Sequence, residues 1–159
     1  MDSSCTRPKG MAAAGLLAAI AALVVLVAAA SGEAGTNLTK QQWKKQADAL
    51  CAAAIAKNHK HNPLYPAAKA AAVGDQVVAV SRRTMRSIRA LQPPAAERAA
   101  VARLLALGDA AVGGLARAIA AAKSGNEQAF MTAARRADTL VDKAHAAARG
   151  YGLRACARW

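Results

Sequence analysis

Residues 38–58 read LTKQQWKKQADALCAAAIAKN, and this stretch gives the clearest indication of the fold. Thr39 and Gln42 stand three residues apart, which is the spacing of a capping box, where each side chain bonds the other residue's backbone N–H. We therefore predict a helix that begins at Lys40 and runs to about residue 58. Its apolar stripe, with residues every three or four positions, comprises Trp43, Ala47, Leu50, Cys51, Ala54 and Ile55.

Two further segments repeat the helical spacing between proline breaks. The second helix is predicted over about 66–91, and its apolar face is expected to hold Val73, Val77, Val80, Thr84, Ile88 and Leu91. The third helix is predicted over about 95–123, with its large apolar side chains inward. Three glycines in that segment, which predict a kink or a close packing site, are Gly108, Gly113 and Gly114.

The fourth helix follows turn residues of the sequence SGNE at 124–127. Either Ser124 or Asn126 has the chemistry of its N-cap. Gly150 has the place of a C′ glycine, so we expect the helix to end just before it, with a short tail to residue 159.

The amino-acid composition also favours helices over strands. Hydrophobic residues make up 55% of the chain, but most are alanine and aromatics reach only 3%. Alanine favours helix and disfavours strand, so no strand is expected. Four amphipathic helices with short connections predict an all-α fold, an up-down antiparallel four-helix bundle over residues 39–159 with a thin core. A three-helix core with a detached first helix is the alternative.

Residues 1–30 have the pattern of a secretory signal peptide. Arg7 and Lys9 precede an uncharged run of 20 residues that ends in three alanines. We expect cleavage after Ala30; the alternative is an uncleaved signal anchor, which leaves a single-pass protein with its N-terminus inside. Both alternatives place the helical domain outside the cytoplasm, where it is secreted or otherwise extracytoplasmic. A flexible spacer over residues 31–38 is expected to precede the domain.

The cysteines support this location. Cleavage leaves only Cys51 and Cys156, so a single intramolecular pairing exists, and an oxidising compartment permits it. The first and last elements of an up-down bundle are neighbours, and closing a loop of roughly 100 residues contributes about 4.7 kcal/mol in the chain-entropy treatment. We predict this disulfide, with two buried free thiols as the alternative.

The formal net charge is +13; residues 1–30 contribute only one net positive charge, which leaves +12 on the exported part. Such an excess favours anionic partners, and outside the cytoplasm these are anionic lipid or a cell-wall polymer. The densest basic cluster, a candidate anion-binding site because arginine matches phosphate geometry, consists of Arg82, Arg83, Arg86 and Arg89. An ordinary solvated helix face is the alternative. Nucleic acid is not expected as a partner, because no aromatic residue is interleaved with these arginines.

His59 and His61 are candidate metal ligands, and His145 could supply a third imidazole. Histidines near a helix C-terminus are also favoured by the helix dipole without a metal. His145 shares a helical stripe with Asp138, Asp142 and Arg149, which we interpret as a solvated charged face.

The sequence lacks the usual catalytic signatures, among them G-x-S-x-G, H-E-x-x-H, C-x-x-C-H and a phosphate-binding glycine loop. Its few acidic residues are scattered, so no acid–base pair is evident. We expect a protein that is not an enzyme and has no cofactor, and that binds an anionic envelope component or an envelope protein. Contact with the membrane is expected only if the leader stays uncleaved, and the alternative function is metal binding.

Three segments resemble small secreted or surface-attached helical proteins of high-GC Gram-positive bacteria: TKQQWKKQADALCAAA (39–54), LQPP (91–94) and YGLRAC (151–156). The likeness extends over nearly the whole exported part. It implies export and a pairing of Cys51 with Cys156, and it carries over no catalytic residue.

Overall fold

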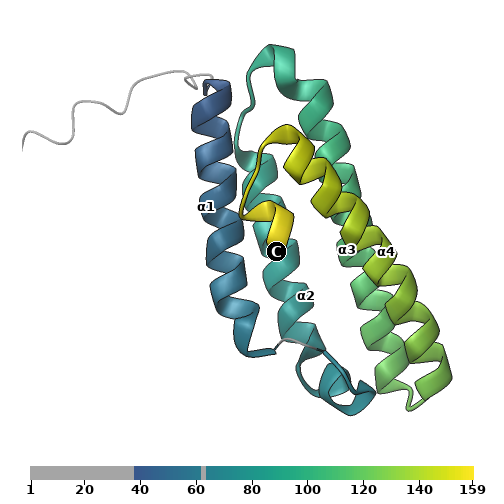
Figure 1. Cartoon of the computed structure of the whole chain (residues 1–159). Helices are drawn as coiled ribbons and strands as arrows, with labels where there is room; N and C mark the ends of the chain where they lie inside the picture. The colour runs from purple at the N-terminus through teal and green to yellow at the C-terminus, as the bar shows by residue number, and fades with distance from the viewer. Residues whose placement is uncertain (1–37, 62–63) are drawn as a thin grey trace, which may run out of the picture. The chain divides into compact units, whose positions relative to one another are not determined.

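The computed structural model describes residues 38–61 and 64–159, so the expected leader over 1–30 and nearly all of the spacer lie outside the described residues. The described part is all helical, with four helices that pack against each other and no strand (Figure 1). Its elements are α1 (Lys40–Asn58), η1 (His59–His61), α2 (Ala67–Ala90), η2 (Ala95–Glu97), α3 (Arg98–Lys123), α4 (Glu127–Tyr151) and η3 (Cys156–Arg158).

The predicted starts of α1 and α4 are confirmed, whereas α3 begins at Arg98 and not at residue 95, because residues 95–97 form the short 3-10 helix η2. The Gln42 N–H donates to Thr39 Oγ1 at 3.2 Å, and the Thr39 N–H donates to Gln42 Oε1 at 2.8 Å, which completes the capping box of α1. At α4 the N-cap is Asn126 and not Ser124, because Asn126 Oδ1 accepts the Ala129 N–H at 2.9 Å. Side-chain caps thus specify the starts of both α1 and α4.

The predicted end of α4 is wrong by two residues. Gly150 is helical, and Gly152 is the residue that adopts the left-handed conformation, at φ 85°. The Leu153 N–H bonds the Ala148 carbonyl and the Gly152 N–H bonds that of Arg149, both at 2.9 Å, which is a Schellman motif. The helix ends here because Leu153, just past the glycine, is buried beside Ala148 in the core.

The core is thin, as expected, and falls into two clusters of buried residues. One surrounds Trp43 and includes Cys51, Ile88, Val101, Leu153 and Cys156. The other joins α2, α3 and α4 and includes Val78, Ala118, Ile119, Phe130 and Ala134. Among the described residues, the largest side chains that are fully buried are those of Trp43 and Cys51.

The buried face of α2 is rotated from the predicted one. Val77, Thr84 and Ile88 are buried as expected, but Val73 and Val80 are only half-buried. Gly74, Val78, Ser81 and Met85 are buried in their place. The rotation brings Gly74 against α3, where a Cβ at this position would lie 2.7 Å from Ile119 Cγ1. Close approach of the two helices therefore decides which face is buried.

The helices are not equally close to one another. α3 packs along both α2 and α4, whereas α1 packs against α2 and against η3 and has little direct contact with α4 (Figure 1). α3 is one uninterrupted helix from Arg98 to Lys123, and two of its glycines are the expected close packing sites: a Cβ on Gly108 would lie 2.7 Å from Met85 Cε, and one on Gly114 3.2 Å from Ala137 Cα. The alternative of a detached first helix is wrong, because α1 contributes the centre of one core cluster.

Candidate functional site

The main candidate site is an apolar cavity of about 820 Å³ bordered by all four helices and by the C-terminal tail (residues 152–159). Large apolar side chains of α3 border it, namely Leu104, Leu105, Val112 and Leu115. These four were predicted to point inward, and the structure leaves them half-buried. Leu104 and Leu105 pack against the first core cluster, and Val112 and Leu115 against the second, so one side of each contacts the core while the cavity leaves the rest uncovered.

The cavity follows from small residues on the facing helices. Buried alanines border it from three helices: Ala70, Ala111, Ala118, Ala134 and Ala137. Each methyl group fills much less space than a leucine would. Because α1 also has little contact with α4, the helices leave room between them that the few large side chains do not fill.

Four of the bordering residues are exposed and mark where the cavity meets solvent: His59, Tyr65, Asp138 and Arg158. They come from η1, from the connection before α2, from α4 and from η3. The Tyr65 hydroxyl donates to Asp138 Oδ2 at 3.3 Å and so bridges one end of this opening. The opening therefore lies between the first connection, α4 and the tail.

The tail is held over the cavity by contacts from α1. The Cys51–Cys156 disulfide is confirmed, with an S–S distance of 2.10 Å and Cα atoms 5.0 Å apart. Asp48, one turn before Cys51, accepts the N–H groups of Arg154, Ala155 and Cys156 at 2.8, 3.0 and 3.2 Å. The carboxylate thus caps the start of η3, binding the N–H groups of the two residues before it and of its first residue.

Sequence reasoning missed the role of Asp48. The available signal was that Asp48 is the only acidic residue of α1 and lies three positions before the predicted disulfide cysteine. That spacing places both side chains on one side of the helix. The partners of the carboxylate are backbone groups more than 100 residues away, and residue types do not reveal such partners.

The charged stripe of α4 also holds the tail. His145 Nε2 donates to the Trp159 carbonyl at 2.6 Å, and the Arg149 guanidinium approaches the Ala157 carbonyl at 3.5 Å. The interpretation of this stripe as a merely solvated face is therefore wrong for His145 and Arg149, because their partners come from the tail. Together with Asp48, these contacts fix the tail to both α1 and α4.

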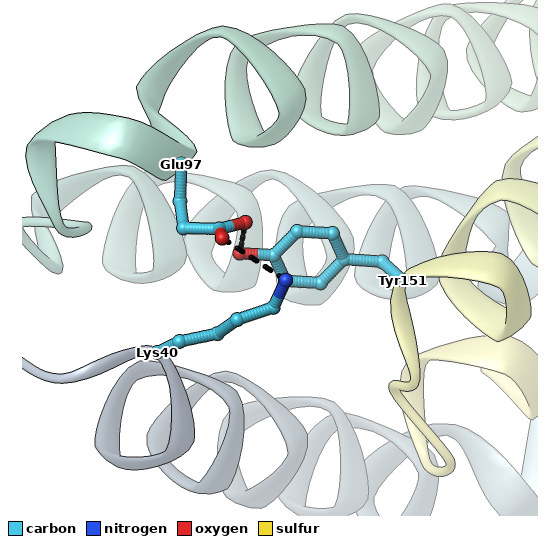
Figure 2. A network of polar contacts seen from close by, with 3 residues as sticks. All are labelled: Lys40, Glu97 and Tyr151. Atoms are coloured by element: carbon cyan, nitrogen blue, oxygen red, sulfur yellow. Dashed lines mark hydrogen bonds and ion pairs between the residues drawn. The ribbon is translucent and has the colours of Figure 1, made fainter.

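A second polar cluster joins α1, η2 and α4 away from the cavity (Figure 2). The Tyr151 hydroxyl donates to Glu97 Oε2 at 2.9 Å, and Lys40 Nζ donates to Glu97 Oε1 at 3.0 Å. The Tyr151 ring meets Trp43 edge-on, with centroids 5.6 Å apart. The Trp43 Nε1–H donates to the Leu91 carbonyl at 3.2 Å.

The electrostatics of this cluster indicate a structural role. Burial raises the pKa of Tyr151 to about 12, and its hydrogen bond to Glu97 acts in the same direction. Hydrogen bonds from Lys40 and Tyr151 lower the pKa of Glu97. At neutral pH the phenol is therefore protonated and the carboxylate ionised, so both groups keep their bond and neither is poised to exchange a proton.

The arginines of the predicted anion-binding cluster are all exposed on α2: Arg82, Arg83, Arg86 and Arg89. None of them borders the cavity. Arg89 forms an ion pair with Asp109 of α3, so part of its charge is balanced within the chain. These four arginines thus lie apart from the cavity.

Among the described residues, the structure adds no third ligand to the predicted pair His59 and His61. In the described part of the chain, no three side chains of the metal-binding types His, Cys, Asp and Glu form a group. His59 and His145 both border the cavity, whereas His61 does not.

Of the described helices, one segment, Ala95–Lys123, is long and apolar enough to cross a membrane by length and composition alone, and in the fold it packs against α2 and α4.

No protein-family model matches the chain, and neither a curated protein nor a solved structure is significantly similar to it. Function is accordingly inferred from the geometry of the chain's own residues.

Proposed function

We propose that this chain is a non-enzymatic, exported binding protein whose helical domain takes up the apolar part of an amphiphilic envelope molecule. The observation that carries the proposal is the cavity of about 820 Å³, with its mainly apolar border. Ligand pockets typically measure roughly 300–1,000 Å³ and are lined mainly by apolar side chains, with a few polar groups that fix orientation. The cavity has that size and that chemistry.

The positive charge supports an anionic surface as the place of action. With +12 on the exported part, the domain is drawn towards anionic lipid or wall polymer over long range. The exposed arginines Arg82, Arg83 and Arg86 on α2 offer guanidinium groups to such a surface. In this proposal the basic face brings the domain to the envelope, and the cavity selects the bound molecule.

Binding is favoured over catalysis by the engagement of the polar groups at the cavity's border. Asp138 accepts a hydrogen bond from Tyr65, and His145 donates to the Trp159 carbonyl, so each holds a neighbouring segment.

The proposal also takes the helices as an antiparallel up-down bundle, because short connections join each helix to the next.

A metal-binding role through His59 and His61 stays a prediction, and titration with zinc and copper against a His59→Ala/His61→Ala variant tests it.

A neutral apolar dye, N-phenyl-1-naphthylamine, tests the proposal directly, because its fluorescence rises when it leaves water. We expect saturable binding by the oxidised wild-type domain. Ala144→Phe adds a ring at the cavity's border and should weaken binding at least tenfold. Ala146→Phe is the matched control, since Ala146 is exposed and does not border the cavity. Absence of saturable binding, or equal binding by the two variants, would contradict the proposal.

A further inference from the structure

Arg158 places a positive charge at the border of the cavity. It belongs to η3, in the tail that folds back between α1 and α4 (Figure 1). Its side chain is exposed, and no carboxylate in the described part of the chain forms an ion pair with it. Among the described residues at the cavity's border, Arg158 is the only arginine or lysine. The charge is therefore available to a molecule that enters the cavity.

The backbone on both sides of Arg158 is held in place, which restricts where the guanidinium group can lie. Cys156 is tied to α1 by the disulfide, and the Trp159 carbonyl accepts from His145 at 2.6 Å. Arg158 Nε donates to the Arg154 carbonyl at 3.3 Å. That bond uses one of the five N–H donors of the guanidinium, and an acceptor outside the chain can bind the two terminal NH₂ groups.

From this placement we infer that the ligand of the cavity carries an anionic head group, a carboxylate or a phosphate, and that Arg158 binds this group while the apolar chain lies in the cavity. The inference rests on the proposed function and specifies the polar end of its ligand. A guanidinium binds either anion through two parallel N–H···O bonds. Arg158 thus supplies one of the few polar contacts that orient a molecule in a mainly apolar site.

The negative charge at the cavity's border lies on another side of the opening. Asp138 accepts from the Tyr65 hydroxyl at 3.3 Å, beside the connection that precedes α2. The tail meets α4 at His145, seven residues further along the helix, which is a rise of about 10 Å. Asp138 therefore marks the Tyr65 side of the opening and Arg158 the tail side, and an anionic head group is favoured at the tail side.

Three ten-carbon probes that differ in the head group test the inference: decanoate, decyl phosphate and decan-1-ol. Their affinities are measured at neutral pH and low salt by displacement of N-phenyl-1-naphthylamine from the oxidised domain. Arg158→Gln removes the guanidinium group. Arg154→Gln is the matched control, because Arg154 is an exposed arginine of the same tail that does not border the cavity. Both variants lower the net charge by the same amount.

We expect Arg158→Gln to weaken the binding of at least one of the two anions about fivefold and that of decan-1-ol less than twofold. A fivefold loss is roughly 1 kcal/mol, the upper range for an exposed ion pair. Arg154→Gln should change all three affinities less than twofold. The anion that loses more affinity in Arg158→Gln identifies the head group as carboxylate or phosphate, and retained binding of decan-1-ol shows that the variant stays folded.

Three results would overturn the inference. The first is that Arg158→Gln leaves both anion affinities unchanged, or that neither anion displaces the dye from the wild type. The second is an equal loss in Arg154→Gln, which would indicate long-range attraction and not a contact. The third is an equal loss for decan-1-ol, because Arg158 would then act through the position of the tail. Saturable dye binding by the wild type leaves the proposed function standing in each case, whereas both ideas fall if neither the dye nor any probe binds.

Discussion

Asp48 provides the sharpest test of how the tail is held in place. Its two carboxylate oxygens accept three consecutive backbone N–H groups, from Arg154, Ala155 and Cys156, at 2.8 to 3.2 Å. Hydrogen bonds to an ionised group contribute about 1.5–3 kcal/mol each, and a buried donor left unpaired costs a similar amount. The Ala155 and Cys156 N–H groups are shielded from solvent, so they lose most when the acceptor is removed.

For Asp48→Ala we expect a loss of roughly 2–4 kcal/mol, less than the sum of three bonds because the Arg154 N–H regains water. Asp48→Asn keeps one acceptor oxygen but turns an NH₂ group towards a backbone donor, and should cost roughly half as much. For a domain of this size about 1 kcal/mol corresponds to roughly 4 °C, so Asp48→Ala should lower the melting temperature by about 8–16 °C.

The assay is thermal unfolding followed by circular dichroism, on oxidised protein at neutral pH. Asp142→Asn is the matched control, because Asp142 is an exposed carboxylate on α4 and its substitution should change the melting temperature by less than about 2 °C. A melting temperature of Asp48→Ala within 2 °C of the wild type would refute the reasoning. An equal fall of the melting temperature in both variants would show that loss of a negative charge, and not loss of the cap, destabilises the domain.

Two further predictions concern helix packing and pH. Gly150→Ala should stabilise the fold by about 0.5–1 kcal/mol, since a Cβ at this position meets nothing within 4 Å. Gly114→Val should destabilise it by about 1–3 kcal/mol, because a Cβ there already lies 3.2 Å from the Ala137 Cα. Chemical denaturation measures both changes, and the same sign for the two would contradict this account. The raised pKa of Tyr151, about 12, stabilises the fold below pH 10, and this contribution should disappear as the pH rises from about 10 to 12, whereas Tyr151→Phe should lack that pH-dependent part. The lowered pKa of Glu97 makes stability depend on pH in the opposite direction. The stabilisation from the ionised Glu97 carboxylate is present at neutral pH and is lost as the pH falls below about 4.5. Unfolding free energies of wild type and Tyr151→Phe across both ranges check this, and parallel curves at high pH would count against it.

Local signals in the sequence predict where α1 and α4 start. Thr39 with Gln42 places the start of α1, and the start of α4 is narrowed to a cap at Ser124 or Asn126, because a cap is made between residues only three positions apart. The pairing of Cys51 with Cys156 is also predicted, because the third cysteine, Cys5, lies in the expected leader and these two are the cysteines of the expected helical domain. These features depend on few residues, so the sequence alone defines them.

Features that depend on distant parts of the chain are not predicted. Gly150 and Gly152 are equally able to adopt a positive φ, and the burial of Leu153 in the core decides between them. The Val73 face of α2 is as apolar as the observed one, but only Gly74 permits the close approach of Ile119. In both cases tertiary packing chooses between local alternatives of similar energy.

The cavity could not be predicted either, yet its cause is visible in the composition. Alanine and glycine let α3 and α4 approach closely, as at Gly114 against Ala137, but the same small side chains cannot span the distance from these helices to α1. A domain that relied on packing alone would draw α1 in and close that space. Here the disulfide and the Asp48 cap hold α1 through the tail, so stability does not require the interior to be filled. The contacts that hold the tail and the open cavity are therefore two consequences of one alanine-rich core.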